Sequence, residues 1–113
     1  MALDFERDVN PLVSLYLTDD EVRWSKENRV IWLNNAIKEI RYLRPDSTLD
    51  EWDTIEYEDY DIAHPKDLII ADIFLNDIVN YICWKCYAQD SQDEFNMKQA
   101  EAKKNDFFRG VRI

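Results

Sequence analysis

The chain has 113 residues, which is enough for one folded domain with a modest core and too few for two. Hydrophobic residues make up 46% of it and charged residues 34%, a balance typical of a folded protein. Its formal net charge is −10, whereas nucleic-acid-binding proteins usually carry a basic patch. The composition therefore disfavours a free-standing binder of DNA or RNA.

The scarcity of glycine points to helices. The single glycine is Gly110, three residues from the end, and tight β-hairpins usually need glycine in their turns. We therefore predict a mainly α fold, a small bundle of about four helices in a single domain over residues 1–113. A short irregular or β-like acidic segment is expected between the second and third helices.

The first predicted helix runs from Asp4 to Leu17. Its apolar positions recur at helical spacing and form one face, made of Phe5, Val9, Leu12 and Tyr16. Pro11 allows two interpretations: Asn10 caps a shorter helix with Pro11 at its first position, or one longer helix tolerates a kink there. We favour the longer helix.

The second predicted helix, Lys26 to Leu43, has clear boundaries. Ser25 is a good N-cap residue, and Pro45 ends the helix because the residue before a proline is disfavoured in the α conformation. The apolar residues recur at steps of three and four along one face, namely Val30, Leu33, Ile37 and Ile40.

The segment that follows is strongly acidic and has no helical period. Residues 46–61 contain eight acids and no base. Most such runs are solvated loops, and this one lacks the spacing and the glycine of a calcium-binding loop. We predict that its acids face solvent or a channel, in particular Asp50, Glu51, Asp53, Glu56, Glu58, Asp59 and Asp61.

The third predicted helix is the longest, from Pro65 to Ala88. One stripe is expected to face the core, formed by Leu68, Ala71, Leu75, Ile78, Ile82 and Cys86. At about 100° per residue, Ile69, Ile73 and Trp84 fall far from that stripe. A helix that is apolar on two sides needs two packing partners, so these three residues are predicted to contact a neighbouring subunit.

The last predicted helix runs from Gln92 to Arg109 and has a thin apolar pattern. Phe95 and Ala102 lie on one side, and Met97 and Phe108 on another. The end of the chain either completes this helix against the core or forms a docking tail over residues 107–113. The docking residues would be Phe107, Phe108, Arg109, Val111, Arg112 and Ile113.

Motifs that carry chemistry are sparse, so we expect neither an enzyme nor a cofactor or metal site. Cys83 and Cys86 have the C-x-x-C spacing, but they lie near the end of a helix rather than at its N-terminus, which favours a structural role. His64 is the only histidine, too few for a zinc site with these cysteines. With no signal peptide and no membrane span, synthesis in a reducing cytoplasm is expected.

Several short motifs, taken in order, resemble one protein family. They are Trp24-Ser25, Leu33-Asn34-Asn35-Ala36, Arg44-Pro45-Asp46, then Asp72, Leu75, Asp77, Tyr81, Tyr87-Ala88 and Asp90-Ser91, and finally Asn96, Ala100 and Phe107 or Phe108. This order resembles the head-to-tail adaptor (head completion) proteins of tailed bacteriophages, over most of residues 5–108. The segment 47–63 is short where some relatives carry a β-rich insertion.

The resemblance implies a structural virion protein at the portal vertex. Such adaptors are helical proteins that form a ring, commonly of twelve copies, between the portal protein and a tail or nozzle protein. The ring extends the channel through which double-stranded DNA passes without specific binding, and an acidic wall would let DNA slide past. Expected partners are therefore the portal, the tail component and further copies of this chain.

One alternative comes from a different functional class. A small acidic regulatory or DNA-mimic protein, bound to a basic site on a host enzyme, would also use an acidic run and many aromatic residues. Association with virions would distinguish the adaptor from this inhibitor.

Overall fold

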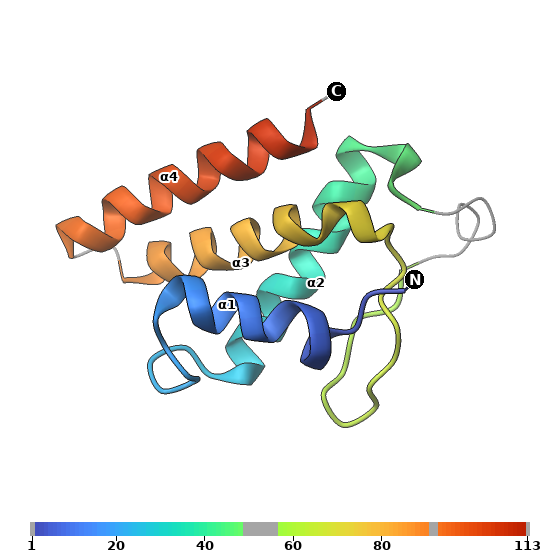
Figure 1. The fold of residues 1–113 in the computed structure, drawn as a ribbon, viewed down its shortest axis with the longest axis horizontal. Coiled ribbons are helices and arrows are strands. Elements are labelled where there is room, and N and C mark those ends of the chain that lie inside the picture. Colours follow the sequence, from blue (N-terminus) through green and yellow to red (C-terminus); the bar gives the residue numbers. More distant parts are fainter. Residues whose placement is uncertain (1, 49–56, 91–92, 113) are drawn as a thin grey trace.

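The computed structural model describes residues 2–48, 57–90 and 93–112, and within these residues the protein is a mainly helical bundle (Figure 1). Four α-helices are seen: α1 (Asn10–Leu17), α2 (Lys26–Leu43), α3 (Leu75–Gln89) and α4 (Glu94–Val111). Helix α3 is central, because it packs against α1, α2 and α4. The predicted fold class is confirmed.

The first helical segment is continuous from Phe5 to Leu17, as the favoured interpretation of Pro11 requires. A π-helical turn (Phe5–Val9) leads directly into α1, and Pro11 lies in the first turn of α1, where no backbone donor is needed. Asp4 caps the segment, since its Oδ2 accepts a hydrogen bond from the Arg7 amide at 2.9 Å.

The predicted apolar face of this segment is partly wrong. Its buried residues are Phe5, Val9, Val13 and Leu17, whereas Leu12 is half-buried and Tyr16 is 43% exposed. A π-helical turn holds one more residue than an α-helical turn, so the face that begins at Phe5 and Val9 continues one position later than expected.

Helix α2 has the predicted boundaries. Ser25 Oγ accepts a hydrogen bond from the Asn28 amide at 3.2 Å, and the helix ends at Leu43, just before a 3₁₀ turn that starts at Pro45 (Pro45–Ser47). All four residues predicted for its apolar face are buried: Val30, Leu33, Ile37 and Ile40. The N-cap residue, the apolar period and the proline after the helix all indicate the same boundaries, so local sequence signals suffice to predict this helix.

The third helix begins at Leu75 and not at Pro65. Residues 65–71 are irregular, followed by a 3₁₀ turn (Asp72–Phe74). The Leu68 amide donates to the Leu3 carbonyl at 2.9 Å in an antiparallel bridge, and the Ala71 amide donates to the Ser47 carbonyl at 2.7 Å. Leu68 and Ile70 are both buried while Ile69 is half-buried, which is the alternation of an extended segment.

Helix α4 covers α3 with a face that the sequence did not indicate. Its buried residues are Asn96, Ala100, Phe107 and Val111, whereas Phe95 and Met97 are 62% and 54% exposed, and Ala102 is exposed too. Asp93 caps the helix, since its Oδ1 accepts a hydrogen bond from the Phe95 amide at 2.8 Å. The thin predicted stripe of α4 is therefore wrong for Phe95, Met97 and Ala102.

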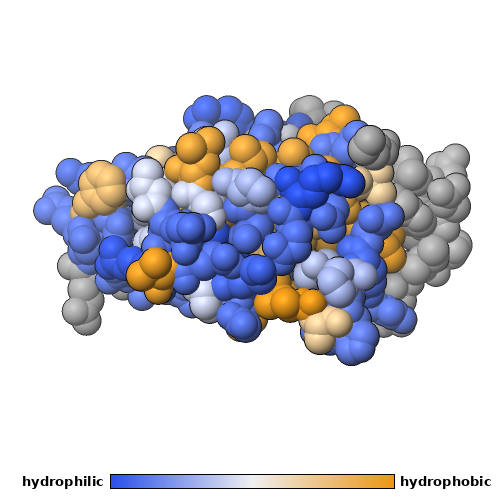
Figure 2. Space-filling model, turned by 60° about the horizontal axis from the view of Figure 1, so that its bottom comes forward, coloured by the Kyte–Doolittle hydropathy of each residue, from blue (hydrophilic) through white to orange (hydrophobic). Residues whose placement is uncertain are grey.

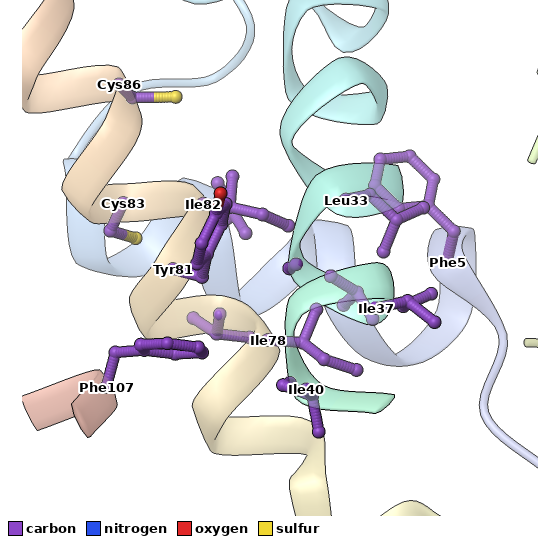
Figure 3. Packing of buried hydrophobic residues seen from close by; sticks show 14 of the residues in the cluster. Phe5, Leu33, Ile37, Ile40, Ile78, Tyr81, Ile82, Cys83, Cys86 and Phe107 are labelled. Carbon is purple, nitrogen blue, oxygen red and sulfur yellow. The ribbon is translucent and has the colours of Figure 1, made fainter. Parts of the chain in front are cut away.

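The core lies mainly between α2 and α3. Figure 3 shows Ile37 and Ile40 of α2 facing Ile78 and Ile82 of α3, and Phe107 reaching α3 from α4. Each of these five side chains is completely buried. Burial of one such side chain stabilises the fold by about 1.5–3 kcal/mol, so this layer holds the bundle together.

Gly110 permits a close approach of α4 to α3. A Cβ atom at this position would overlap the carboxyl group of Asp77, with the Asp77 Cγ only 2.9 Å away. The Asp77 carboxyl is buried, and this burial raises its pKa, while the Arg44 guanidinium acts in the opposite direction. The lone glycine is therefore needed for packing, although it lies within a helix.

We expect Gly110→Ala to lower the free energy of unfolding by about 1 kcal/mol, because overpacking costs about 1–3 kcal/mol and alanine regains about 1 kcal/mol of helix propensity. Urea denaturation would measure the difference. In an Asp77→Ala background the overlap is gone, so the same substitution should become stabilising. Destabilisation of equal size in both backgrounds would contradict this explanation.

Candidate functional site

A cleft of about 560 Å³ opens at one end of the bundle, where residues of the α1–α2 loop meet residues of α3 and α4. Four segments contribute to it: the end of α1, the loop before α2, the end of α3 and the start of α4. The lining residues are Tyr16, Leu17, Thr18, Asp19, Arg23, Trp24, Tyr87, Asp93, Phe95, Asn96 and Gln99.

Aromatic side chains give the cleft its shape. Trp24 and Tyr87 are each only 6% exposed and meet edge to face, with ring centroids 5.7 Å apart. The Tyr87 hydroxyl donates to the Tyr16 carbonyl oxygen at 3.1 Å, which ties α3 to α1. Tyr16 and Phe95 remain well exposed. The cleft thus combines a fixed aromatic floor with two accessible aromatic rings.

Arg29 holds the loop beside the cleft in place, although it belongs to α2 and is completely buried. Its Nε donates to the Trp24 carbonyl oxygen at 3.0 Å, and its Nη1 donates to Asn10 Oδ1 at 2.9 Å and to Ser14 Oγ at 2.7 Å. Its Nη2 donates to the carbonyl and carboxylate oxygens of Asp19, at 2.8 and 3.2 Å. All parts of the guanidinium are therefore bonded.

Asp19 is the anionic partner of Arg29, and its carboxylate also accepts hydrogen bonds from two backbone amides of the loop. Burial alone would raise the pKa of the Asp19 carboxyl. Hydrogen bonds from the Arg23 and Trp24 amides and the charge of Arg29 lower the pKa by more, so it lies below its usual value. The carboxylate is ionised at neutral pH and fixes the loop over residues 19–24. No local sequence pattern indicated this pair, because its members are ten residues apart.

Charged groups of both signs lie at the cleft, with Lys103 Nζ 4.4 Å from the Tyr16 ring centroid. Arg23 forms an ion pair with Asp90 and lies over the Trp24 ring, with its guanidinium carbon 5.0 Å from the ring centroid. Asp93 has no ion-pair partner among the described residues. The acids of this end lie in two short runs, Asp19, Asp20 and Glu21 on the loop and Asp90, Asp93 and Glu94 between α3 and α4.

The predicted subunit-contact residues do not form one face. Since α3 starts only at Leu75, Ile69 and Ile73 precede the helix; Ile69 is half-buried, whereas Ile73 is 78% exposed. Trp84 packs within the chain, against Phe107 and Phe108 of α4, and Lys85 Nζ lies 4.0 Å from its ring centroid. Of the three, only Ile73 is a free apolar side chain.

The C-terminal residues complete α4 rather than forming a free tail. Phe107 and Val111 are buried in the core, Phe108 is half-buried, and the helix continues to Val111. Arg109 and Arg112 are exposed, and Ile113 lies outside the described residues. Of the two interpretations of this segment, the structure supports packing against the core.

The predicted channel acids are only partly described. Asp50, Glu51, Asp53 and Glu56 lie outside the described residues, as does most of the expected strand-like segment. Three exposed acids of the run each have a side-chain partner: Glu58 lies 3.5 Å from Lys66 Nζ, Asp59 lies 2.8 Å from Lys38 Nζ, and Asp61 lies 3.2 Å from His64 Nδ1. Such exposed pairs contribute little to stability.

Cys83 and Cys86 are free thiols on adjacent turns of α3, and both are completely buried (Figure 3). Burial raises the pKa of each thiol to about 12. A redox pair needs an accessible thiolate, so the geometry fits the predicted structural role. Among the described residues, no group of three or more histidine, cysteine or acidic side chains is placed to hold a metal ion.

The thiols should therefore be unreactive while the protein is folded. We expect a thiol reagent such as dithiobisnitrobenzoate to modify Cys83 and Cys86 at least about 100-fold more slowly in native buffer than in denaturant, because modification requires opening of the core. Absorbance of the released thionitrobenzoate measures both rates. Rapid native modification of even one thiol would contradict the structural role.

Within the described residues, no helix is long and apolar enough to cross a membrane. Comparison with known proteins finds no match to this chain among family models, curated proteins or solved structures.

Proposed function

We propose that this protein is a structural adaptor that joins the portal to the tail of a bacteriophage and assembles with further copies of itself. The observation that carries the proposal is a pair of different apolar patches at opposite ends of the bundle. Two unlike patches on one chain are what a head-to-tail contact between identical subunits requires, and such contacts generate rings when the rotation closes.

The first patch, which we name the loop-end patch, consists of Tyr16, Val22 and Phe95. Tyr16 and Phe95 line the 560 Å³ cleft, and Val22 lines a neighbouring one that shares Arg23 and Trp24 with it. Val22 is 88% exposed, on the loop between α1 and α2. Exposed apolar groups at two adjoining clefts are typical of a protein contact.

The second patch, which we name the helix-end patch, consists of Tyr42, Leu43 and Ile73. Tyr42 is 81% exposed and ends α2 together with Leu43, while Ile73 lies in the turn before α3. These segments are neighbours, since the Ala71 amide bonds the Ser47 carbonyl and Arg44 lies over the Phe74 ring. In Figure 1 the end of α2 and the start of α3 lie opposite the α1–α2 loop.

On the face shown in Figure 2, the hydrophobic groups are separated by hydrophilic surface and do not merge into one broad area. Two small contacts of this kind suit subunits that are stable alone and assemble on a template. A net charge of −10 would also let DNA pass through a ring without being held.

Residues that carry the family resemblance have structural tasks in this fold. Asn34 Oδ1 accepts hydrogen bonds from the Tyr57 hydroxyl at 2.6 Å and the Tyr60 amide at 2.7 Å, which fixes the segment after the acidic run. Arg44 pairs with Asp46 at 2.7 Å and donates to the Val111 carbonyl at 3.2 Å. These residues of the motifs therefore have structural roles in the bundle.

The proposal is tested by deleting the gene from the phage genome that encodes the chain and examining the particles by cryo-electron microscopy. We expect DNA-filled heads without tails, and a ring of this chain below the portal in unmodified particles. Complete tailed particles from the deletion would overturn the proposal. The acidic-inhibitor alternative has weaker support, because Glu58 and Asp59 are each paired with a lysine rather than free to imitate phosphates.

A further inference from the structure

We propose that the cleft is the receptor for a second copy of this chain, whose Tyr42 side chain enters it. This inference rests on the proposed self-assembly and adds the two surfaces that meet. It assigns a binding role to the cleft of about 560 Å³ beside the α1–α2 loop and an anchoring role to the last turn of α2.

The anchor is the most exposed aromatic side chain among the described residues. Tyr42 is 81% exposed, and within the described part of the chain it has no hydrogen bond or ring contact. Tyrosine is enriched among the residues that dominate binding energy at interfaces, because it buries a large apolar area with little loss of conformational freedom. Leu43 and Ile73 beside it would widen the buried area.

The receptor has suitable room and chemistry. Its volume of about 560 Å³ lies within the range of about 300–1,000 Å³ typical of pockets that hold small organic molecules, so it can admit a phenol ring. Tyr16 and Phe95 offer exposed rings for stacking or edge contacts. Asn96 and Gln99 in the lining, and Asp93 at the start of α4, offer acceptors for the phenol hydroxyl.

Charge favours the same orientation. Arg112 is exposed at the end of α4, which lies beside the end of α2 because Arg44 donates to the Val111 carbonyl at 3.2 Å. Arg109 is exposed too and lies 3.7 Å from its partner Asp106. Asp93 is an exposed acid in the lining of the cleft, and Asp20 is exposed on the adjoining loop. A docked copy would bring its Arg112 guanidinium towards these carboxylates, and such complementarity fixes orientation and speeds association.

The receptor is also preorganised. The buried Arg29 holds the loop at residues 19–24 through Asp19 and the Trp24 carbonyl, so docking does not have to order this wall. Because receptor and anchor are different surfaces of the chain, one chain cannot satisfy the contact alone, and each copy can both supply an anchor and accept one.

Disulfide cross-linking of two single variants tests this geometry. Leu43→Cys, which keeps the Tyr42 anchor, and Phe95→Cys are prepared separately in the full chain, mixed at high concentration and oxidised with copper phenanthroline, which takes up the two electrons of disulfide formation. We expect about tenfold more cross-linked dimer in the mixture than in either variant alone, because docking raises the effective concentration of the two thiols. Both replaced side chains are exposed, and the native Cys83 and Cys86 are buried.

The matched control replaces Leu43→Cys by Ile31→Cys, on the same helix and 56% exposed. Mixed with Phe95→Cys, it should give only the background of random collisions. An equal yield with this control would overturn the proposal, as would equal or higher yields of homodimer in either single variant. These outcomes leave the adaptor function open to its own test, because tailless heads on gene deletion do not depend on which surfaces meet.

Discussion

Replacing Arg29 by methionine should lower the free energy of unfolding by about 3–5 kcal/mol, the usual cost of removing one partner from a buried ion pair. Methionine has similar length but no donor. Its introduction leaves Asp19 without its cationic partner and deprives Asn10, Ser14 and the Trp24 carbonyl of hydrogen bonds inside the fold. Urea denaturation followed by circular dichroism measures the change.

Lys38→Met is the matched control, because Lys38 lies on the same helix and also pairs with an aspartate, Asp59 at 2.8 Å. Its side chain is 51% exposed, and exposed pairs contribute less than about 1 kcal/mol. If both variants lost equally little stability, Arg29 would not have the structural role assigned to it. Arg29→Lys should recover only part of the loss, since an ammonium cannot reproduce the planar fork of a guanidinium.

The Asp19–Arg29 pair also predicts how stability depends on pH. The pKa of Asp19 is lower in the folded protein than in the unfolded chain, so the folded state favours the ionised form. Its contribution is complete above the unfolded pKa, near 3.9, and is lost as the pH falls through the lower folded value. Denaturation across this acid range should show a smaller pH dependence for Asp19→Asn than for the original chain. An unchanged slope would exclude Asp19 as a source of acid sensitivity.

Phe107→Ala should lower the free energy of unfolding by about 3–5 kcal/mol, because it removes a fully buried ring and leaves a cavity between α3 and α4. The ring lies 5.1 Å from the Tyr81 centroid, at an angle of 68°, and 5.1 Å from the Phe108 centroid. Helix α4 packs mainly on α3, so this cluster is its principal attachment. Thermal and urea unfolding would both report the loss.

Phe95→Ala serves as the control within the same helix. Phe95 is 62% exposed, and surface substitutions usually change stability by less than about 0.5 kcal/mol. The pair of variants separates the two interpretations of the C-terminal segment. If Phe107 belonged to a free docking tail, Phe107→Ala would leave stability unchanged and affect assembly alone.

Local sequence signals determined part of the fold. Ser25, the apolar period from Val30 to Ile40 and Pro45 each act within a few residues, and α2 begins and ends where they indicate. The lack of glycine before Gly110 correctly predicted helices joined by other turns. The C-x-x-C spacing was rightly assigned to the core, because the position of Cys86 on an apolar stripe is a property of the helix itself.

The tertiary structure alone decided where distant segments meet. Residues 65–71 are not helical because Leu68 pairs with Leu3 and Ala71 with Ser47, contacts that no local period reveals. A charged residue on a helix normally faces solvent, so Arg29 could be recognised as buried only once Asn10, Ser14 and Asp19 were seen around it. The cleft likewise exists only where α1, α3 and α4 come together. Short-range propensities fix helices and their ends, whereas burial and the pairing of buried polar groups depend on residues that the chain brings together from far apart.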